Sequence, residues 1–117
     1  MKRFLRSFRY AGRGLSAGWR GQTNIRVMTV LALLAIGLGW WTGLSTVEWA
    51  VLALTIGLVL SLELLNTAGE KLVDILSPGY DDRYGQVKDI LAAAVLIASI
   101  AAATVGVLIF APRLFGN

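Results

Sequence analysis

Three long apolar runs constrain the fold of this chain more than any other feature of its sequence. They extend over residues 27–44, 47–62 and 90–111, and only Glu48 interrupts the second, near its start. Each run approaches or exceeds the roughly 20 residues that an α-helix needs to cross about 30 Å of hydrocarbon. Because 56% of the residues are hydrophobic and only 15% are charged, the bilayer is the expected solvent. The runs therefore predict an all-α membrane protein with three transmembrane helices.

The residue types that the chain lacks narrow its chemistry. The 117 residues include no cysteine and no histidine. A disulfide framework, a thiolate metal site and the commonest general base are therefore excluded, and any catalysis must rely on Glu, Asp, Lys, Arg, Asn or hydroxyl groups. The length predicts one domain, over residues 1–117.

Lysine and arginine are distributed unevenly along the chain. Residues 1–26 carry seven Lys or Arg and no acid, whereas the remainder carries four bases and seven acids. The connection over residues 71–89 contains three bases and the one over residues 42–48 contains none. The positive-inside rule therefore predicts a multi-pass protein whose N-terminus is cytoplasmic, and Trp40, Trp41 and Trp49 are expected at the outer interface.

The first 20 residues predict an amphipathic helix on the membrane surface. On a helical wheel an apolar side and a basic side separate, namely Phe4, Phe8, Ala11, Leu15 and Trp19 against Lys2, Arg6, Arg9, Arg13 and Arg20. Such a helix lies in the interface, with its cations among anionic headgroups or near anionic ligands. An anchor that only sets the topology remains an equal alternative.

The second membrane helix is predicted to be longer than the bilayer requires. The sequence stays compatible with helix over residues 47–76, where Ser77-Pro78-Gly79 supplies a stop. A turn-rich stretch from Ser77 to Gly85 then leads to the third membrane helix, predicted over residues 88–111, and the first is predicted over residues 27–44.

A polar stripe follows this long helix. Glu63, Asn66, Glu70 and Asp74 stand at intervals of three, four and four residues, which places them on one face. Glu63 lies about 24 Å along the helix from residue 47, near the inner edge of the hydrocarbon, and the later acids lie at headgroup level. Acids at membrane depth usually face a polar interior and serve a function.

The depth of the stripe suits a reaction between a lipid hydroxyl and a water-soluble nucleotide. A carboxylate can accept the hydroxyl proton, and Mg²⁺ prefers oxygen ligands together with substrate phosphates. Arg3, Arg6 and Lys88 are candidates to neutralise the transferring phosphoryl group. The alternative is a set of helix–helix hydrogen bonds with solvated acids, and Lys88 and Asp89 also fit a positive-inside marker and a helix N-terminal charge.

The run Glu63-Leu-Leu-Asn-Thr-Ala-Gly-Glu-Lys-Leu-Val-Asp74, followed after thirteen residues by Lys88-Asp89, resembles the signature of the prokaryotic diacylglycerol kinase and undecaprenol kinase family. The resemblance covers nearly the whole chain. It implies a bacterial inner-membrane lipid kinase that uses ATP and Mg²⁺, and a homotrimer with active sites shared between subunits. No nucleic-acid partner is expected.

The resemblance also implies roles for individual residues. Glu63 is expected to be the general base on the lipid hydroxyl and Glu70 to bind the metal, with Asn66 and Asp74 in support. The remaining nucleotide contacts are expected from Arg3, Tyr10, Tyr80, Lys88 and Asp89.

One residue departs from the family pattern. A family glutamate that contributes to metal binding corresponds here to Gln22. An amide oxygen can still coordinate a hard cation but brings no charge, so the metal is expected to be held more weakly or one metal to be lost. A non-catalytic or activity-impaired membrane protein of the same fold is therefore the alternative to a lipid kinase.

Overall fold

The structure is a computed structural model that describes residues 1–21, 23–79 and 81–116 of the chain. It consists of four α-helices: α1 (Lys2–Gly21), α2 (Thr23–Thr42), α3 (Thr46–Leu76) and α4 (Asp82–Phe115). The described residues contain no β-strand. Because α2, α3 and α4 are each long and apolar enough to cross a membrane, the predicted all-α fold with three membrane helices is confirmed.

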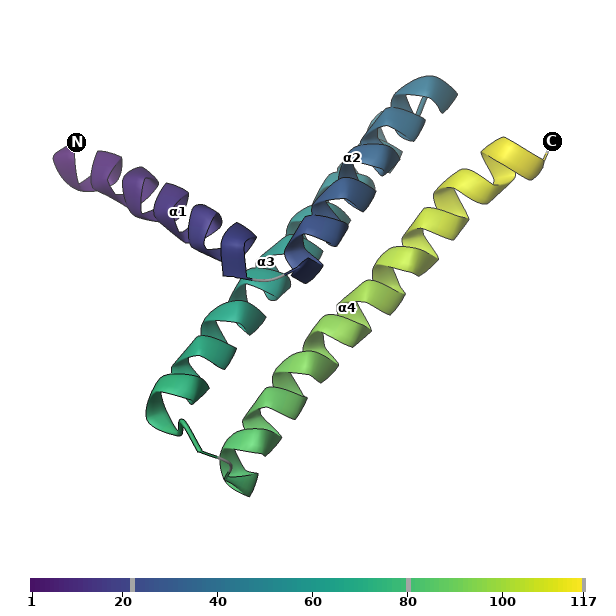
Figure 1. The fold of residues 1–117 in the computed structure, drawn as a ribbon. Coiled ribbons are helices and arrows are strands. Elements are labelled where there is room, and N and C mark those ends of the chain that lie inside the picture. The colour runs from purple at the N-terminus through teal and green to yellow at the C-terminus, as the bar shows by residue number, and fades with distance from the viewer. Residues whose placement is uncertain (22, 80, 117) are drawn as a thin grey trace.

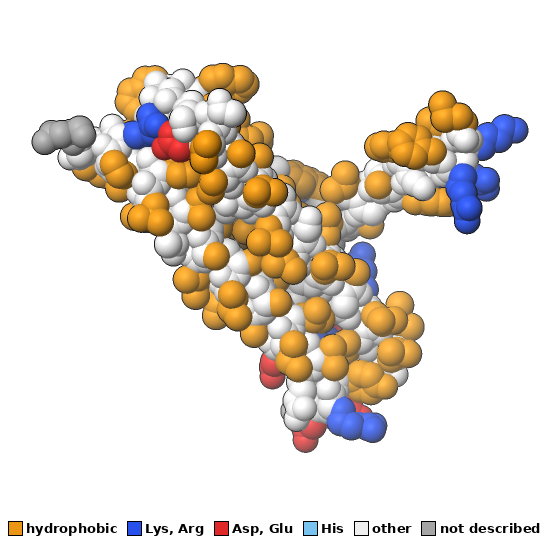
Figure 2. All heavy atoms as spheres, turned by 180° about the vertical axis from the view of Figure 1, so that it is seen from behind, with side chains coloured by type: hydrophobic (Ala, Val, Ile, Leu, Met, Phe, Trp, Pro, Cys, Tyr) orange, Lys and Arg blue, Asp and Glu red, His pale blue; other side chains and the backbone are white. Residues whose placement is uncertain are grey.

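The three long helices form an open bundle from which α1 projects sideways (Figure 1). α3 and α4 run side by side and make the largest helix–helix contact, while α2 packs on α3 and touches α4 little. On the face drawn in Figure 2, hydrophobic side chains cover most of the middle of the bundle, and charged side chains gather at its ends and along α1. Apolar flanks with satisfied helical backbones are what a bilayer requires of a spanning segment.

A tight connection joins α2 to α3. Gly43 has φ of 76°, in the left-handed region that favours glycine, and its N–H and that of Leu44 donate to the Gly39 carbonyl at 2.9 and 3.3 Å. The Ser45 hydroxyl then accepts from the Glu48 N–H at 3.2 Å, and the Glu48 carboxylate accepts from the Ser45 N–H at 2.9 Å. This reciprocal cap fixes where α3 begins.

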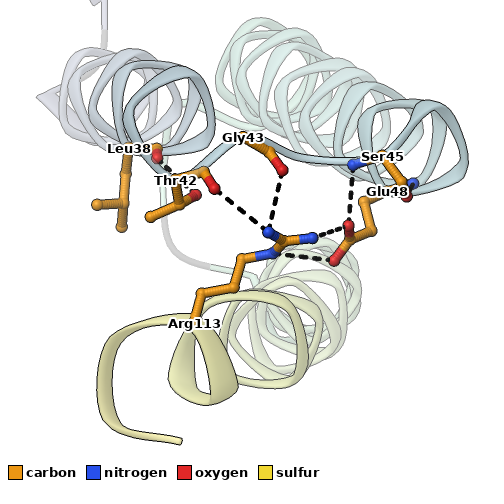
Figure 3. Close-up of polar contacts among 6 residues, drawn as sticks. All are labelled: Leu38, Thr42, Gly43, Ser45, Glu48 and Arg113. Atoms are coloured by element: carbon orange, nitrogen blue, oxygen red, sulfur yellow. Dashed lines mark hydrogen bonds and ion pairs between the residues drawn. The ribbon is translucent and has the colours of Figure 1, made fainter. Parts of the chain in front are cut away.

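Arg113, near the end of α4, closes the same end of the bundle (Figure 3). Its guanidinium pairs with Glu48 and donates to the carbonyls of Thr42 and Gly43 at 3.3 and 3.0 Å. These are carbonyls that the end of α2 leaves without helical partners. Beneath this Arg113 clasp lies the buried apolar cluster, which comprises Leu44, Leu52, Ile109 and Phe110. The three membrane helices are thus joined at the α2–α3 end.

The start of α4 corrects the predicted boundary at residue 88 and the predicted turn up to Gly85. The helix begins six residues earlier, because the Asp81 carboxylate caps it by accepting from the Arg83 N–H at 2.9 Å. α2 likewise begins at Thr23 rather than residue 27, and α4 continues to Phe115 rather than ending at residue 111. Hydropathy marks where a helix is apolar, whereas caps decide where it begins.

We expect Arg113→Ala to lower the melting temperature of the purified protein in detergent by several degrees. The substitution leaves the Thr42 and Gly43 carbonyls without the guanidinium donor and Glu48 without its ion-pair partner, and partly buried polar groups that lose partners destabilise a fold. The control is Arg83→Ala, because the Arg83 side chain is 85% exposed and such surface ion pairs contribute little. Equal melting temperatures for the two variants would contradict a structural role for the clasp.

Candidate active site

The polar stripe lies on one unbroken helix. α3 continues to Leu76, where the Ser77 N–H donates to the Val73 carbonyl at 2.8 Å and Pro78 follows. Glu63 and Glu70 are therefore separated by seven residues, or roughly 10 Å along the axis. The continuous helix holds the stripe in a fixed register from the middle of the bundle to the α3–α4 end.

Glu63 is buried where α2 crosses α3. The residue is 1% exposed, and its Oε1 accepts a hydrogen bond from Nδ2 of Asn24 on α2. One turn further along α3, the buried Thr67 hydroxyl donates to the Glu63 carbonyl at 3.0 Å. Within the described part of the chain no lysine or arginine forms an ion pair with Glu63. A carboxyl group this deeply buried depends on hydrogen bonds, and here its partner is a neutral amide.

Asn66 and Glu70 present oxygen atoms next to each other. Asn66 Nδ2 donates to Glu70 Oε1 at 3.3 Å, while Asn66 Oδ1 is buried and has no hydrogen-bond partner among the described residues. A buried acceptor beside a carboxylate suits a hard cation such as Mg²⁺. No group of three or more acidic side chains that could hold a metal occurs in residues 1–21, 23–79 and 81–116. A metal here would therefore need ligands beyond these carboxylates, such as substrate phosphates.

Lys88 lies next to Asp74, at the end of the stripe that is furthest from Glu63. Its ammonium pairs with the Asp74 carboxylate at 2.6 Å, with side chains 41% and 65% exposed, and so links α4 to α3. The earlier start of α4 makes this contact possible, since Lys88 stands on a formed turn of helix. Asp89, the next residue, is exposed. Of the predicted nucleotide contacts, the structure thus brings Lys88 directly to the stripe.

Two other predicted site residues, Arg3 and Tyr10, do not meet the stripe within a single chain. Arg3 and Tyr10 are exposed on the first half of α1, which extends away from the bundle (Figure 1). The ring of Tyr10 lies 5.8 Å from the Arg13 guanidinium carbon. Gln22 and Tyr80 lie outside the described residues. Within a single chain, the site therefore comprises the stripe, Lys88 and the start of α2.

Two residues of this site, Asn24 and Thr67, were not predicted from the sequence. Thr67 was named only as part of the motif, although its position four residues after Glu63 favours a bond to that carbonyl. Asn24 is the last side-chain amide before the first apolar run, and its partner is 39 residues away. The signal available in the sequence was that Asn24 is a polar residue at the edge of a predicted membrane helix.

An apolar groove begins one turn from Glu63 and Asn24. It has a volume of about 570 Å³ and lies between α2 and α4, with α3 as its floor. Met28 on α2 and Leu60 on α3 line the end near the site, and Phe110 lines the other end. Gly106 opens onto the groove, because a Cβ there would meet no atom within 4 Å.

Comparison with known proteins identifies relatives of this chain. The family described as prokaryotic diacylglycerol kinase matches residues 9–110. The chain is 36% identical over 114 residues to an undecaprenol kinase of Bacillus subtilis, which covers 97% of this chain and 93% of that protein. It is 42% identical over 109 residues to a diacylglycerol kinase of Synechocystis sp., covering 92% of this chain and 62% of that protein. It is 34% identical over 100 residues to a diacylglycerol kinase of Escherichia coli, covering 86% of this chain and 82% of that protein.

The resemblance noted from the motif is thereby confirmed, and it extends well beyond the twelve residues of the Glu63–Asp74 run. The chain belongs to the prokaryotic diacylglycerol kinase family, which makes it a lipid kinase, a transferase acting on a membrane lipid.

Proposed function

We propose that this chain transfers the γ-phosphoryl group of ATP, bound with Mg²⁺, to the hydroxyl of undecaprenol or diacylglycerol. The observation that carries the proposal is the buried Glu63 carboxylate, from which α3 leads through Asn66 and Glu70 to the α3–α4 end. The basic N-terminal arm supports a cytoplasmic location for that end in a bacterial plasma membrane. The lipid hydroxyl and the nucleotide then meet at the boundary between acyl chains and water.

In the proposed reaction Glu63 accepts the proton of the lipid hydroxyl. The hydroxyl oxygen forms a bond to the γ-phosphorus, the bond from that phosphorus to the oxygen bridging the β-phosphate breaks, and ADP leaves. Glu70 and Asn66 would hold Mg²⁺, which supplies charge neutralisation to the phosphates when bound. Lys88, released from Asp74, is placed to contact the phosphates, with Asp89 beside it.

The apolar groove supports a site for the hydrocarbon part of the lipid. The sequence identities are compatible with either alcohol, since the chain is 36% identical to an undecaprenol kinase and 42% identical to a diacylglycerol kinase. The groove between α2 and α4 begins beside Glu63 and is lined almost wholly by apolar side chains. We assign it to the apolar chain of the substrate, with the hydroxyl directed at Glu63.

The projecting α1 supports a homotrimer with shared active sites. Arg3 and Tyr10 belong to the first half of α1, and α1 extends away from the bundle (Figure 1), so we assign any contact that they make with nucleotide to a site on a neighbouring subunit. Exposed apolar side chains on α1, such as Phe4 and Phe8, suit either lipid or a neighbour.

We expect Glu63→Gln to abolish most ATP-dependent phosphorylation by the purified protein in lipid vesicles that contain undecaprenol or diacylglycerol. Loss of a general base typically lowers the rate by roughly a hundredfold or more. Asp82→Asn is the matched control, because Asp82 is an exposed acid at the start of α4 without a proposed role. A wild-type rate for Glu63→Gln would remove Glu63 from the role of base.

The departure at Gln22 leads to a prediction about the metal. We expect Gln22→Glu to lower the Mg²⁺ concentration required for the half-maximal rate, because a carboxylate adds charge to an oxygen ligand set. Gln86→Glu adds the same charge on the exposed surface of α4 and serves as the control. An unchanged requirement in Gln22→Glu would show that residue 22 is not a metal ligand in this chain.

Filling the groove should impair use of the lipid. We expect Gly106→Leu to raise the KM for the lipid alcohol severalfold while leaving the KM for ATP unchanged, since the new side chain occupies space that we assign to the apolar chain. Gly57→Leu is the matched control: a Cβ there also meets no atom within 4 Å, but Gly57 does not line the groove. Equal lipid KM values for both variants would place the substrate chain elsewhere.

A further inference from the structure

Asn24 supplies a polar side chain from α2 to the buried end of the stripe. Its Nδ2 donates to Oε1 of Glu63, and the next residue, Ile25, is 5% exposed against the same packing. The contact joins residues 39 positions apart in the chain. It therefore depends on how α2 is set against α3 and not on local sequence.

The position of Asn24 is fixed by the junction between α1 and α2. Two residues later, Arg26 donates from Nε to the Trp19 carbonyl at 2.7 Å and from Nη2 to the Arg20 carbonyl at 3.2 Å. These are carbonyls that the end of α1 leaves unpaired. Gly18 lies so close to α3 that a Cβ on it would come within 2.5 Å of the Leu64 side chain. Arg26 thus fixes the start of α2 to the end of α1, and the end of α1 packs on α3 next to Glu63.

The chemistry of the contact favours a role in catalysis. A lysine or arginine partner would neutralise the Glu63 carboxylate and favour its ionised form, which weakens it as a base. An amide donor instead fixes the direction of one carboxylate oxygen without cancelling its charge. Fixed orientation matters, because small displacements of a reacting group cost large factors in rate.

We propose that Asn24 is a positioning residue that holds Oε1 of Glu63, so that Oε2 is presented to the lipid hydroxyl. The inference rests on the proposed function, in which Glu63 is the base. It gives α2 a part in the reaction that no other assigned residue of α2 provides. It also makes the docking of α1 on α3 a condition for correct placement of the base.

The test compares Asn24→Ala and Asn24→Leu with the wild-type protein in the same vesicles. We expect kcat to fall roughly tenfold to a hundredfold in both variants, with the KM for ATP unchanged, because neither side chain can donate to Glu63. Asn24→Leu keeps the branched shape of the side chain without adding charge and thereby separates lost donation from lost packing. Thr29→Val is the matched control, since the Thr29 hydroxyl bonds within its own helix, to the Ile25 carbonyl at 2.7 Å.

A double-mutant comparison distinguishes positioning from a general structural effect. Once Glu63→Gln has removed the base, adding Asn24→Ala should lower the residual rate no further, whereas a structural contact would lower it again. Wild-type kcat in both Asn24 variants, together with an inactive Glu63→Gln, would overturn this inference and leave the proposed function intact. Full activity of Glu63→Gln would instead overturn the proposed function itself.

Discussion

A carboxyl group at membrane depth needs a hydrogen-bond donor within reach, and Glu63 obtains one from Asn24 on α2. An ionisable residue that faces lipid at the bilayer centre costs roughly 2.5 to 3.5 kcal/mol on insertion scales, so the packing of α2 on α3 is tied to this contact. The start of α2 is in turn set by Arg26 and by the close approach of Gly18 to Leu64. The end of α1 is therefore part of the packing that surrounds the buried acid, in addition to the predicted role of α1 at the membrane surface.

The two ends of the bundle differ in how completely their polar groups are paired. At the α2–α3 end, Arg113 satisfies Glu48 and two carbonyls above a buried apolar cluster (Figure 3). Toward the α3–α4 end, Asn66 Oδ1 is buried without a partner among the described residues, and the Lys88–Asp74 pair is exposed. A firmly joined end and an open, polar end suit a protein that must admit substrates from one side. The apolar groove extends from Phe110 at the first end to Met28 and Leu60, one turn from Asn24 and Glu63.

The sequence alone predicted those parts of the structure that local patterns determine. Apolar runs identified three membrane helices, and the spacing from Glu63 to Asp74 placed one polar face on a helix that continues to Leu76. The predicted start of the third membrane helix, at residue 88, was wrong because the Asp81 cap begins α4 within a stretch whose composition is typical of turns. The partners of Glu63 and Glu48 were not predicted, because these contacts span 39 and 65 residues and depend on how helices cross. Periodicity cannot determine such crossings.

In the proposed function, the shape of the groove constrains the lipid. The groove ends one turn from Glu63 and is bordered by α2 and α4, which touch little. A groove between two loosely associated helices can accept chains of different length, because its far end is bounded by side chains such as Phe110 and by the membrane itself. If the groove holds the lipid chain as proposed, selection between an isoprenoid alcohol and a diacylglycerol would depend on the groups next to the hydroxyl. Those groups would lie against Glu63, Asn24 and the docked end of α1.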